Sequence, residues 1–372
     1  MKPTLILKVL AVCALGLSLC GCSNSSNDNT PDNMVTYTLL CDKTQADVKE
    51  PITFTVKSST GQDVTAMWTF WDENFCFESN VISYDFPGSH TIVAYSQADN
   101  SLSTNTVTVT INGDDQYDYY RRTLFMKWTA TWCPACPSME TALEEIMDMP
   151  AYQDRIVPVA LHCLENDYCY VGPGIGDMFN STAMDYYIEY IPTCVVDFDS
   201  ELQVVGAEQP AMQRLFDKSL SRVPYSKTPG LAIETSLDGR ELSFTIKYNV
   251  REDGEYLLGC YFIEDGVQTY QSGAPNNRMV QNHVIHASLT DGVSTFGLYD
   301  CGYISVGYEF EYSSSYNIPI HQKPADFVLD NCQLVYFICK KDSSVAPYKY
   351  YCANVATVKV GESAGYEYES VQ

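Results

Sequence analysis

Short runs of alternating apolar and polar residues fill the chain between residues 35 and 113. The segments 36–40, 52–56, 67–70 and 106–111 alternate or carry β-branched residues, and this period of two is typical of half-buried β-strands. Glycine, asparagine and proline residues stand between the segments as turn formers. The pattern predicts a small β-sandwich over residues 35–113.

The pattern changes between residues 114 and 225, where apolar residues also recur at helical spacing. In the segment 137–149, Met139 and Leu143 mark an apolar helix face, and Glu140 is expected to point outward with the other glutamates. The order strand, helix, strand, helix, strand, strand, helix occupies residues 124–128, 137–149, 155–162, 176–188, 193–198, 202–205 and 209–222. This order predicts a central α/β domain over residues 114–225, with a mixed sheet and helices on both faces.

From residue 228 onward the alternating positions return, most clearly in the segment 242–248. Further strands are expected near residues 256–263, 282–289, 328–339 and 353–360. These segments predict a C-terminal β-sandwich over residues 228–362. The predicted fold class is therefore a multidomain α+β protein.

The N-terminus carries an export signal. Lys2 precedes an apolar run over residues 5–19, and Lys8 lies near its start. This run is too short for a spanning helix, so residues 1–21 are expected to be a signal peptide. Gly21 precedes Cys22, which resembles the lipobox of bacterial lipoproteins and implies lipidation of Cys22, with palmitate among the expected acyl chains.

Residues 22–34 are polar and are expected to be a tether between the lipidated Cys22 and the folded chain. The protein is therefore expected in the cell envelope, as an outer membrane lipoprotein with a periplasmic or surface-facing position and a lipid anchor in the membrane. The alternative is an ordinary secreted protein with a cysteine near its cleavage site.

The net charge limits the classes of partner, and the cysteine content bears on disulfides. The formal net charge is −25, which argues against nucleic acid as a partner, because nucleic acid binding needs clustered lysine and arginine. Of the 15 cysteines, Cys13 and Cys20 leave with the signal peptide and Cys22 carries lipid, so twelve remain. Twelve cysteines in an exported chain predict disulfides, although their spacing does not give the connectivity.

The motif Cys133-Pro134-Ala135-Cys136 stands between a predicted strand and a predicted helix. A thiolate at a helix N-terminus is stabilised by the helix dipole and by free backbone N–H groups, which favours thiol–disulfide chemistry. The alternatives are a zinc half-site and a structural disulfide. Zinc is disfavoured, because no second CxxC and no paired histidines lie at ligand spacing. No metal and no cofactor are therefore expected. His162, at the end of the strand 155–162, is a candidate for tuning the cysteine pair.

The tripeptide Ile191-Pro192-Thr193 directly precedes a predicted strand. Together with the CPAC motif, it resembles the thioredoxin superfamily over roughly residues 115–222. This resemblance implies a thioredoxin-like fold for the central domain.

The same resemblance implies roles for individual residues. Cys133 corresponds to the attacking thiolate, Cys136 to the resolving thiol and Pro192 to a cis proline. Pro192, Ile191 and Trp132 are expected to bind the substrate, whose backbone would pair with this segment as an added strand.

Two features depart from the thioredoxin pattern. Lys127 stands six residues before Cys133, where thioredoxins place a buried carboxylate. If Lys127 points inward, it lowers the thiol pKa directly; if it points outward, the proton acceptor is missing. In addition, a long insertion before Pro192 is expected to cover one side of the site with a helix.

A wider resemblance rests on motifs in three parts of the chain. The lipobox, the CPAC motif followed by proline and the C-terminal β domain resemble the outer membrane protein 28-related lipoproteins of the Gram-negative envelope, in which an arginine often stands at the position of His286. The N-terminal sandwich resembles PKD-type and other immunoglobulin-like modules. The residues that carry the wider resemblance are Trp132-Cys133-Pro134-Ala135-Cys136-Pro137, Asn282-His283-Val284-Ile285-His286, Val335-Tyr336-Phe337-Ile338 and Ala353-Asn354-Val355.

Two functions follow as hypotheses. The first is a lipid-anchored thiol–disulfide oxidoreductase that acts on exported proteins with cysteines or disulfides through Cys133 and Cys136. The second is a non-enzymatic surface or scaffolding lipoprotein, in which the CPAC disulfide is permanent and the β domains bind a partner.

Overall fold

The computed structural model describes residues 35–72, 75–77, 79–84, 88–112, 118–162, 167–169, 173–290, 296–320 and 327–369. Tyr37–Gln372 forms one compact unit. The expected signal peptide, the tether and Cys22 lie outside the described residues. Within those ranges, no helix combines the length and the apolar character that crossing a membrane requires.

Two small sheets form the N-terminal part. One has the order β1-β3-β6, and the other has the order β2-β8-β7-β4-β5, in which β2 and β8 are parallel. Alternate residues such as Phe54, Phe70 and Val109 point between the sheets and are fully buried, as the period of two requires. The strands are β1 (Tyr37–Cys41), β2 (Gln45–Asp47), β3 (Ile52–Ser58), β4 (Trp68–Asp72), β5 (Phe75–Phe77), β6 (Val81–Ile82), β7 (Gly88–Ser96) and β8 (Val107–Asn112).

A nine-stranded sheet runs through the rest of the chain in the order β12-β11-β9-β10-β18-β15-β21-β22, with β19 paired to β15. The pairs β9/β10 and β10/β18 are parallel, and the other pairs are antiparallel. Its strands are β9 (Thr123–Thr129), β10 (Ile156–His162), β11 (Thr193–Val196), β12 (Asp199–Val205), β15 (Gly254–Glu264), β18 (Val284–Ser288), β19 (Tyr299–Ile304), β21 (Cys332–Lys341) and β22 (Tyr350–Lys359).

This sheet overturns the predicted fold class of an immunoglobulin/PKD-like sandwich, a central thioredoxin-like α/β domain and a C-terminal β-sandwich. The prediction of a separate central α/β domain is wrong, because its strand β10 pairs with β18 of the C-terminal part in one sheet. Ala160 pairs with Val284, and the Ala160 N–H donates to the His283 carbonyl at 2.7 Å. Every residue of β10 is buried, which is typical of a central strand. The apolar residues of β10 indicate from the sequence that the strand is buried. They do not indicate that β18 is the strand that pairs with it.

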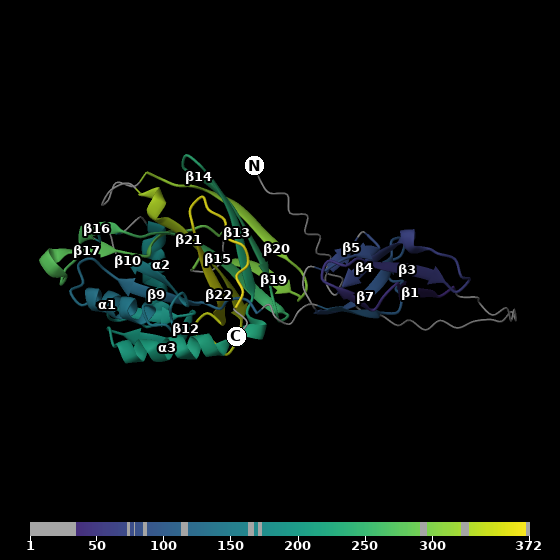
Figure 1. Ribbon diagram of the computed structural model, residues 1–372, viewed down its shortest axis with the longest axis horizontal. Helices are drawn as coiled ribbons and strands as arrows, with labels where there is room; N and C mark the ends of the chain where they lie inside the picture. Colours follow the sequence, from purple (N-terminus) through teal and green to yellow (C-terminus); the bar gives the residue numbers. More distant parts are fainter. Residues whose placement is uncertain are drawn as a thin grey trace, which may run out of the picture. The chain divides into compact units, whose positions relative to one another are not determined.

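Three α-helices occur among the described residues: α1 (Cys136–Met147), α2 (Pro173–Asp185) and α3 (Gln209–Arg222). Successive residues of β9 point to opposite faces of the sheet. Phe125 faces α1 and α3, which lie side by side (Figure 1). Trp128 faces the other core, which includes Met178 of α2. Single 3-10 turns occupy Thr65–Met67, Tyr225–Lys227, Pro275–Asn277 and Leu329–Asn331.

A second layer covers one face of the C-terminal strands. The sheet β13-β14-β20 is antiparallel, and its Ile233 and Phe244 pack in one core with Leu258 and Tyr336 of the large sheet. A separate two-stranded hairpin, β16–β17, leaves the large sheet between β15 and β18. The bounds are β13 (Gly230–Asp238), β14 (Glu241–Asn249), β20 (Phe310–Asn317), β16 (Val267–Tyr270) and β17 (Arg278–Gln281).

A fully buried ion pair joins distant parts of the large sheet. The Arg121 Nη2 lies 2.9 Å from the Asp197 carboxylate and also donates to the Cys352 carbonyl at 3.3 Å. The other Asp197 oxygen accepts the Leu124 N–H at 2.9 Å. Because both charges are removed from water, each depends on the other for compensation.

Candidate functional site

The CPAC loop connects β9 to α1. Cys133 and Cys136 form a disulfide with a Cα–Cα distance of 5.5 Å, and each side chain is only 3% exposed. Helix α1 begins at Cys136 and carries Pro137 in its first turn, where the missing N–H costs no helical hydrogen bond. Both sulfurs therefore lie at the positive end of the helix dipole.

The expectation of several disulfides is not met within the described ranges. Cys133–Cys136 is the one disulfide found there. Several of the other cysteines, among them Cys194, Cys260 and Cys332, lie in the hydrophobic cores. Burial raises the pKa of the Cys194 thiol to about 12, so this cysteine stays protonated and unreactive near neutral pH.

The segment before β11 approaches the cysteine pair. The Ile191–Pro192 peptide bond is cis, as the resemblance to thioredoxins implies. The Cys133 sulfur lies 3.6 Å from the Ile191 carbonyl oxygen, and Trp132 is 42% exposed beside it. The structure thus gathers five of the residues predicted from the sequence around one disulfide. The sixth, Cys22, is outside the described residues.

A buried ion pair joins helix α1 to strand β9, close to Cys136. Lys127 points inward from β9 and binds the carboxylate of Glu140. Both side chains are at most 5% exposed. Glu140 follows Cys136 by four residues, so the two side chains share one face of α1.

This arrangement corrects the expectation that Glu140 points outward. A glutamate on a helix is usually solvated, but here a lysine on the facing strand compensates its charge. The inward position of Lys127 agrees with the first of the two alternatives for that residue. Burial lowers the pKa of Lys127 to about 8, and the negative charge of Glu144 offsets part of this effect.

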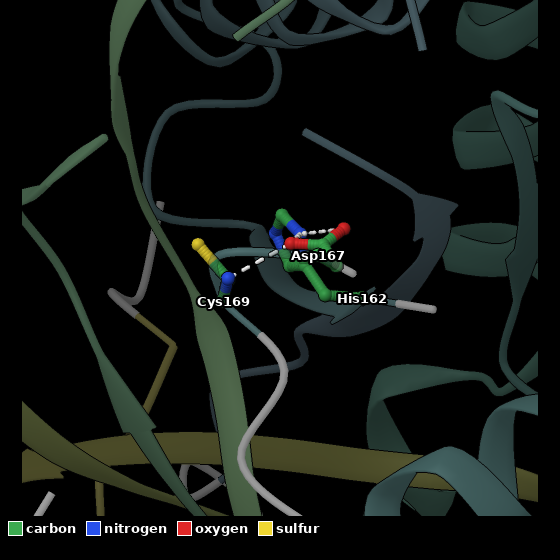
Figure 2. Close-up of side chains that lie close together, drawn as sticks. All are labelled: His162, Asp167 and Cys169. Carbon is green, nitrogen blue, oxygen red and sulfur yellow. Dashed lines mark hydrogen bonds and ion pairs between the residues drawn. The ribbon is translucent and has the colours of Figure 1, made fainter. Parts of the chain in front are cut away.

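On one side, a carboxylate anchors the CPAC loop. Asp167 accepts hydrogen bonds from the Thr131 N–H at 2.9 Å and the Cys169 N–H at 2.8 Å. Its carboxylate also lies 3.1 Å from Nδ1 of His162, and Figure 2 shows the ring beside the carboxylate. All three side chains of this group, His162, Asp167 and Cys169, are almost fully buried.

The ionisation of Asp167 follows from these contacts. Burial alone would raise the pKa of its carboxyl group, but the His162 ring and the two backbone N–H donors outweigh burial and lower the pKa below its ordinary value. The carboxylate therefore stays charged and holds Thr131, two residues before Cys133. His162, which the sequence marked as a tuning candidate, contacts Asp167 among the described residues, and Asp167 in turn holds the loop.

His162, Asp167 and Cys169 also offer potential metal ligands, because one ligand atom from each lies within 4.8 Å of the others. However, both carboxylate oxygens already accept backbone N–H groups. The geometry therefore supports a loop anchor for Asp167. The sequence did not reveal Asp167, since a single acidic residue in a loop carries no motif.

Comparisons with known proteins give a likeness in structure only. No family model matches the chain, and no curated protein matches its sequence. The chain is similar to the solved structure of HBP35 of Porphyromonas gingivalis, with a TM-score of 0.54 and 13% identity, covering 68% of this chain and 80% of that chain. At this identity, the likeness concerns the fold alone.

A second solved structure is that of three N-terminal domains of the bacteriophage RB49 highly immunogenic outer capsid protein (Hoc). It has a TM-score of 0.17 and 6% identity, covering 90% of this chain and 71% of that chain. This score is too low to bear on the fold or the function.

Proposed function

We propose that this protein is a thiol–disulfide oxidoreductase of the cell envelope that acts on exported proteins through Cys133 and Cys136. One observation carries the proposal. The closed disulfide stands at the start of α1 with the Ile191 carbonyl 3.6 Å from the Cys133 sulfur. This combines an exchangeable sulfur pair with an adjacent backbone carbonyl that can accept a hydrogen bond from a polypeptide substrate.

The exchange proceeds through a mixed disulfide. A substrate thiolate attacks the Cys133 sulfur, the Cys133–Cys136 bond breaks, and its electron pair leaves on the Cys136 sulfur. A second substrate thiolate then attacks the substrate sulfur bound to Cys133 and releases the Cys133 thiolate. The substrate dithiol loses two electrons and two protons, which Cys133 and Cys136 gain. The reverse sequence reduces a substrate disulfide, with Cys133 as nucleophile and Cys136 as resolving thiol.

The surroundings favour such an exchange. The dipole of α1 stabilises a thiolate at its N-terminus. The half-exposed Trp132 offers an apolar surface beside the sulfur, and the backbone at Ile191 offers hydrogen-bonding groups for an extended chain. A substrate disulfide in an extended segment fits these contacts.

Trapping of mixed disulfides tests the proposal directly. Cys136→Ala leaves Cys133 without its resolving partner, so we expect exported proteins to stay attached to Cys133 and to be released by a reductant. The double variant Cys133→Ala, Cys136→Ala is the matched control and is expected to trap nothing. An equal yield from the single and the double variant contradicts the oxidoreductase function.

We further propose that the protein is held in the outer membrane by a lipid on Cys22, in line with its resemblance to the outer membrane protein 28-related lipoproteins. Labelling of growing cells with palmitate is expected to mark the wild-type protein and to miss the variant Cys22→Ala. Equal labelling of both proteins contradicts the anchor.

A second candidate function is a non-enzymatic envelope lipoprotein, a scaffold or binding protein with a permanent CPAC disulfide. The burial of the two cysteines favours it, because both are only 3% exposed and a substrate thiolate needs access to the Cys133 sulfur. Under this function, Cys136→Ala traps no protein and the disulfide resists reduction.

A further inference from the structure

The CPAC loop also contacts a segment far along the chain. The residues between β16 and β17 lie against the loop, and Figure 1 places this hairpin near the start of α1. The Ser272 N–H donates to the Thr131 carbonyl at 2.8 Å. The side chain of Gln271 donates from Nε2 to the Cys133 carbonyl at 2.8 Å and to the Ala130 carbonyl at 3.3 Å.

The orientation of Gln271 is itself fixed. Its side chain is 1% exposed, and its Oε1 accepts a hydrogen bond from Nε2 of Gln281 at 2.8 Å. Its Nε2 also lies 3.1 Å from the Ser272 carbonyl. The amide therefore uses both its donor and its acceptor groups in the interior, which leaves it one orientation.

The hairpin approaches the CPAC loop so closely that no side chain fits between the two backbones at Gly273. A Cβ atom on Gly273 would lie 2.2 Å from the Pro134 carbonyl oxygen, and Gly273 has a φ of +82°. Only glycine satisfies both conditions without displacing the chain. The hairpin thus rests directly on the proline between the two cysteines.

We propose that Gln271, oriented by Gln281, is a positioning residue for the Cys133–Cys136 couple. It holds the Cys133 carbonyl, and with it the loop, in the conformation that brings the two sulfurs together. The hairpin thereby stabilises the disulfide relative to the dithiol. This inference rests on the proposed function for its biological meaning, but the equilibrium that Gln271 sets is measurable without a substrate.

The physical reason is the restriction of the loop. Closure of a disulfide depends on the effective concentration of one thiol at the other, which falls when the connecting chain gains freedom. Asp167 and Ser272 fix the loop at Thr131. Gln271 extends the restraint to Cys133 itself. Its loss frees the backbone next to one of the two sulfurs.

The test is the equilibrium of the full-length protein with oxidised and reduced glutathione, read at the Cys133–Cys136 peptide by alkylation and mass spectrometry. Gln271→Leu keeps the volume of the side chain but removes both hydrogen bonds to the loop. Since both bonds are lost together, we expect the constant for disulfide formation to fall about thirtyfold, which raises the reduction potential by about 44 mV. Gln268→Leu, on the exposed side of the same hairpin, is expected to leave the constant within about twofold.

Gln281→Leu provides a second variant that keeps Gln271 and removes only its orienting partner. It is expected to shift the constant in the same direction by a smaller factor. If Gln271→Leu does not fold, this variant decides the question. Constants for Gln271→Leu and Gln281→Leu equal to that of Gln268→Leu overturn the inference.

The outcome separates this inference from the proposed function. A shifted constant together with an empty Cys136→Ala trap supports the positioning role of Gln271 and removes the oxidoreductase function. If Cys136→Ala traps substrates and Gln271→Leu leaves the constant for disulfide formation unchanged, the oxidoreductase function is supported and the positioning role of Gln271 is removed.

Discussion

Replacing Glu140 with glutamine removes the charge that balances Lys127 in the interior. The two side chains are 4% and 5% exposed, so the remaining ammonium has no access to water. Burial lowers the pKa of Lys127 to about 8, and the group is therefore mostly charged near neutral pH. Breaking a buried ion pair costs about 3–5 kcal/mol. Because glutamine keeps the volume and one acceptor oxygen, we expect a loss near the lower limit, about 3 kcal/mol.

Urea unfolding at neutral pH, followed by tryptophan fluorescence, measures this loss. Glu145→Gln is the matched control, since Glu145 lies exposed on the same helix, and is expected to change the free energy of unfolding by less than about 0.5 kcal/mol. The double variant Lys127→Met, Glu140→Leu removes both charges and is expected to regain most of the stability.

The reasoning is refuted if Glu140→Gln is as stable as Glu145→Gln. It is also refuted if the double variant is less stable than Glu140→Gln alone, because the loss would then come from packing and not from an uncompensated charge.

Two further predictions concern the residues that hold the large sheet and the loop. Arg121→Ala removes the cation that lies 2.9 Å from the buried Asp197 carboxylate and is expected to cost about 3–5 kcal/mol in urea unfolding. The exposed Arg214→Ala is expected to cost less than about 0.5 kcal/mol, and equal costs contradict the role of the pair. The pKa of Asp167 is lowered on folding, so its stabilisation is complete above its unfolded pKa of about 3.9 and is lost as pH falls through the folded value. Asp167→Asn should therefore be less stable than wild type at about pH 6 and should approach wild type near pH 2, and a difference that is the same at both pH values contradicts this assignment.

Local signals predicted the cysteine pair well. The CPAC spacing, the apolar strand before it and the helical periodicity after it all lie within a short segment, and the structure places the disulfide between β9 and α1. The cis bond before Pro192 followed from a family resemblance, since nothing in its local sequence requires it.

The sequence predicted less where distant residues decide the structure. The pairing of β10 with β18 overturned the separate α/β domain, because a buried strand shows no preference for its neighbour in its own residues. Glu140 was expected to be exposed to solvent, because the residues around it in the sequence do not show that Lys127 of strand β9 compensates its charge. Gln271 gave no signal at all, because a polar residue in a hairpin is usually solvated.

The reduction potential of the Cys133–Cys136 couple tests the central claim most directly. It is measured on the full-length protein by equilibration with glutathione or dithiothreitol at defined potentials. An exchanging couple is expected to lie above about −300 mV, within reach of cellular thiols. A value well below about −300 mV is that of a structural disulfide, and it would contradict the oxidoreductase function.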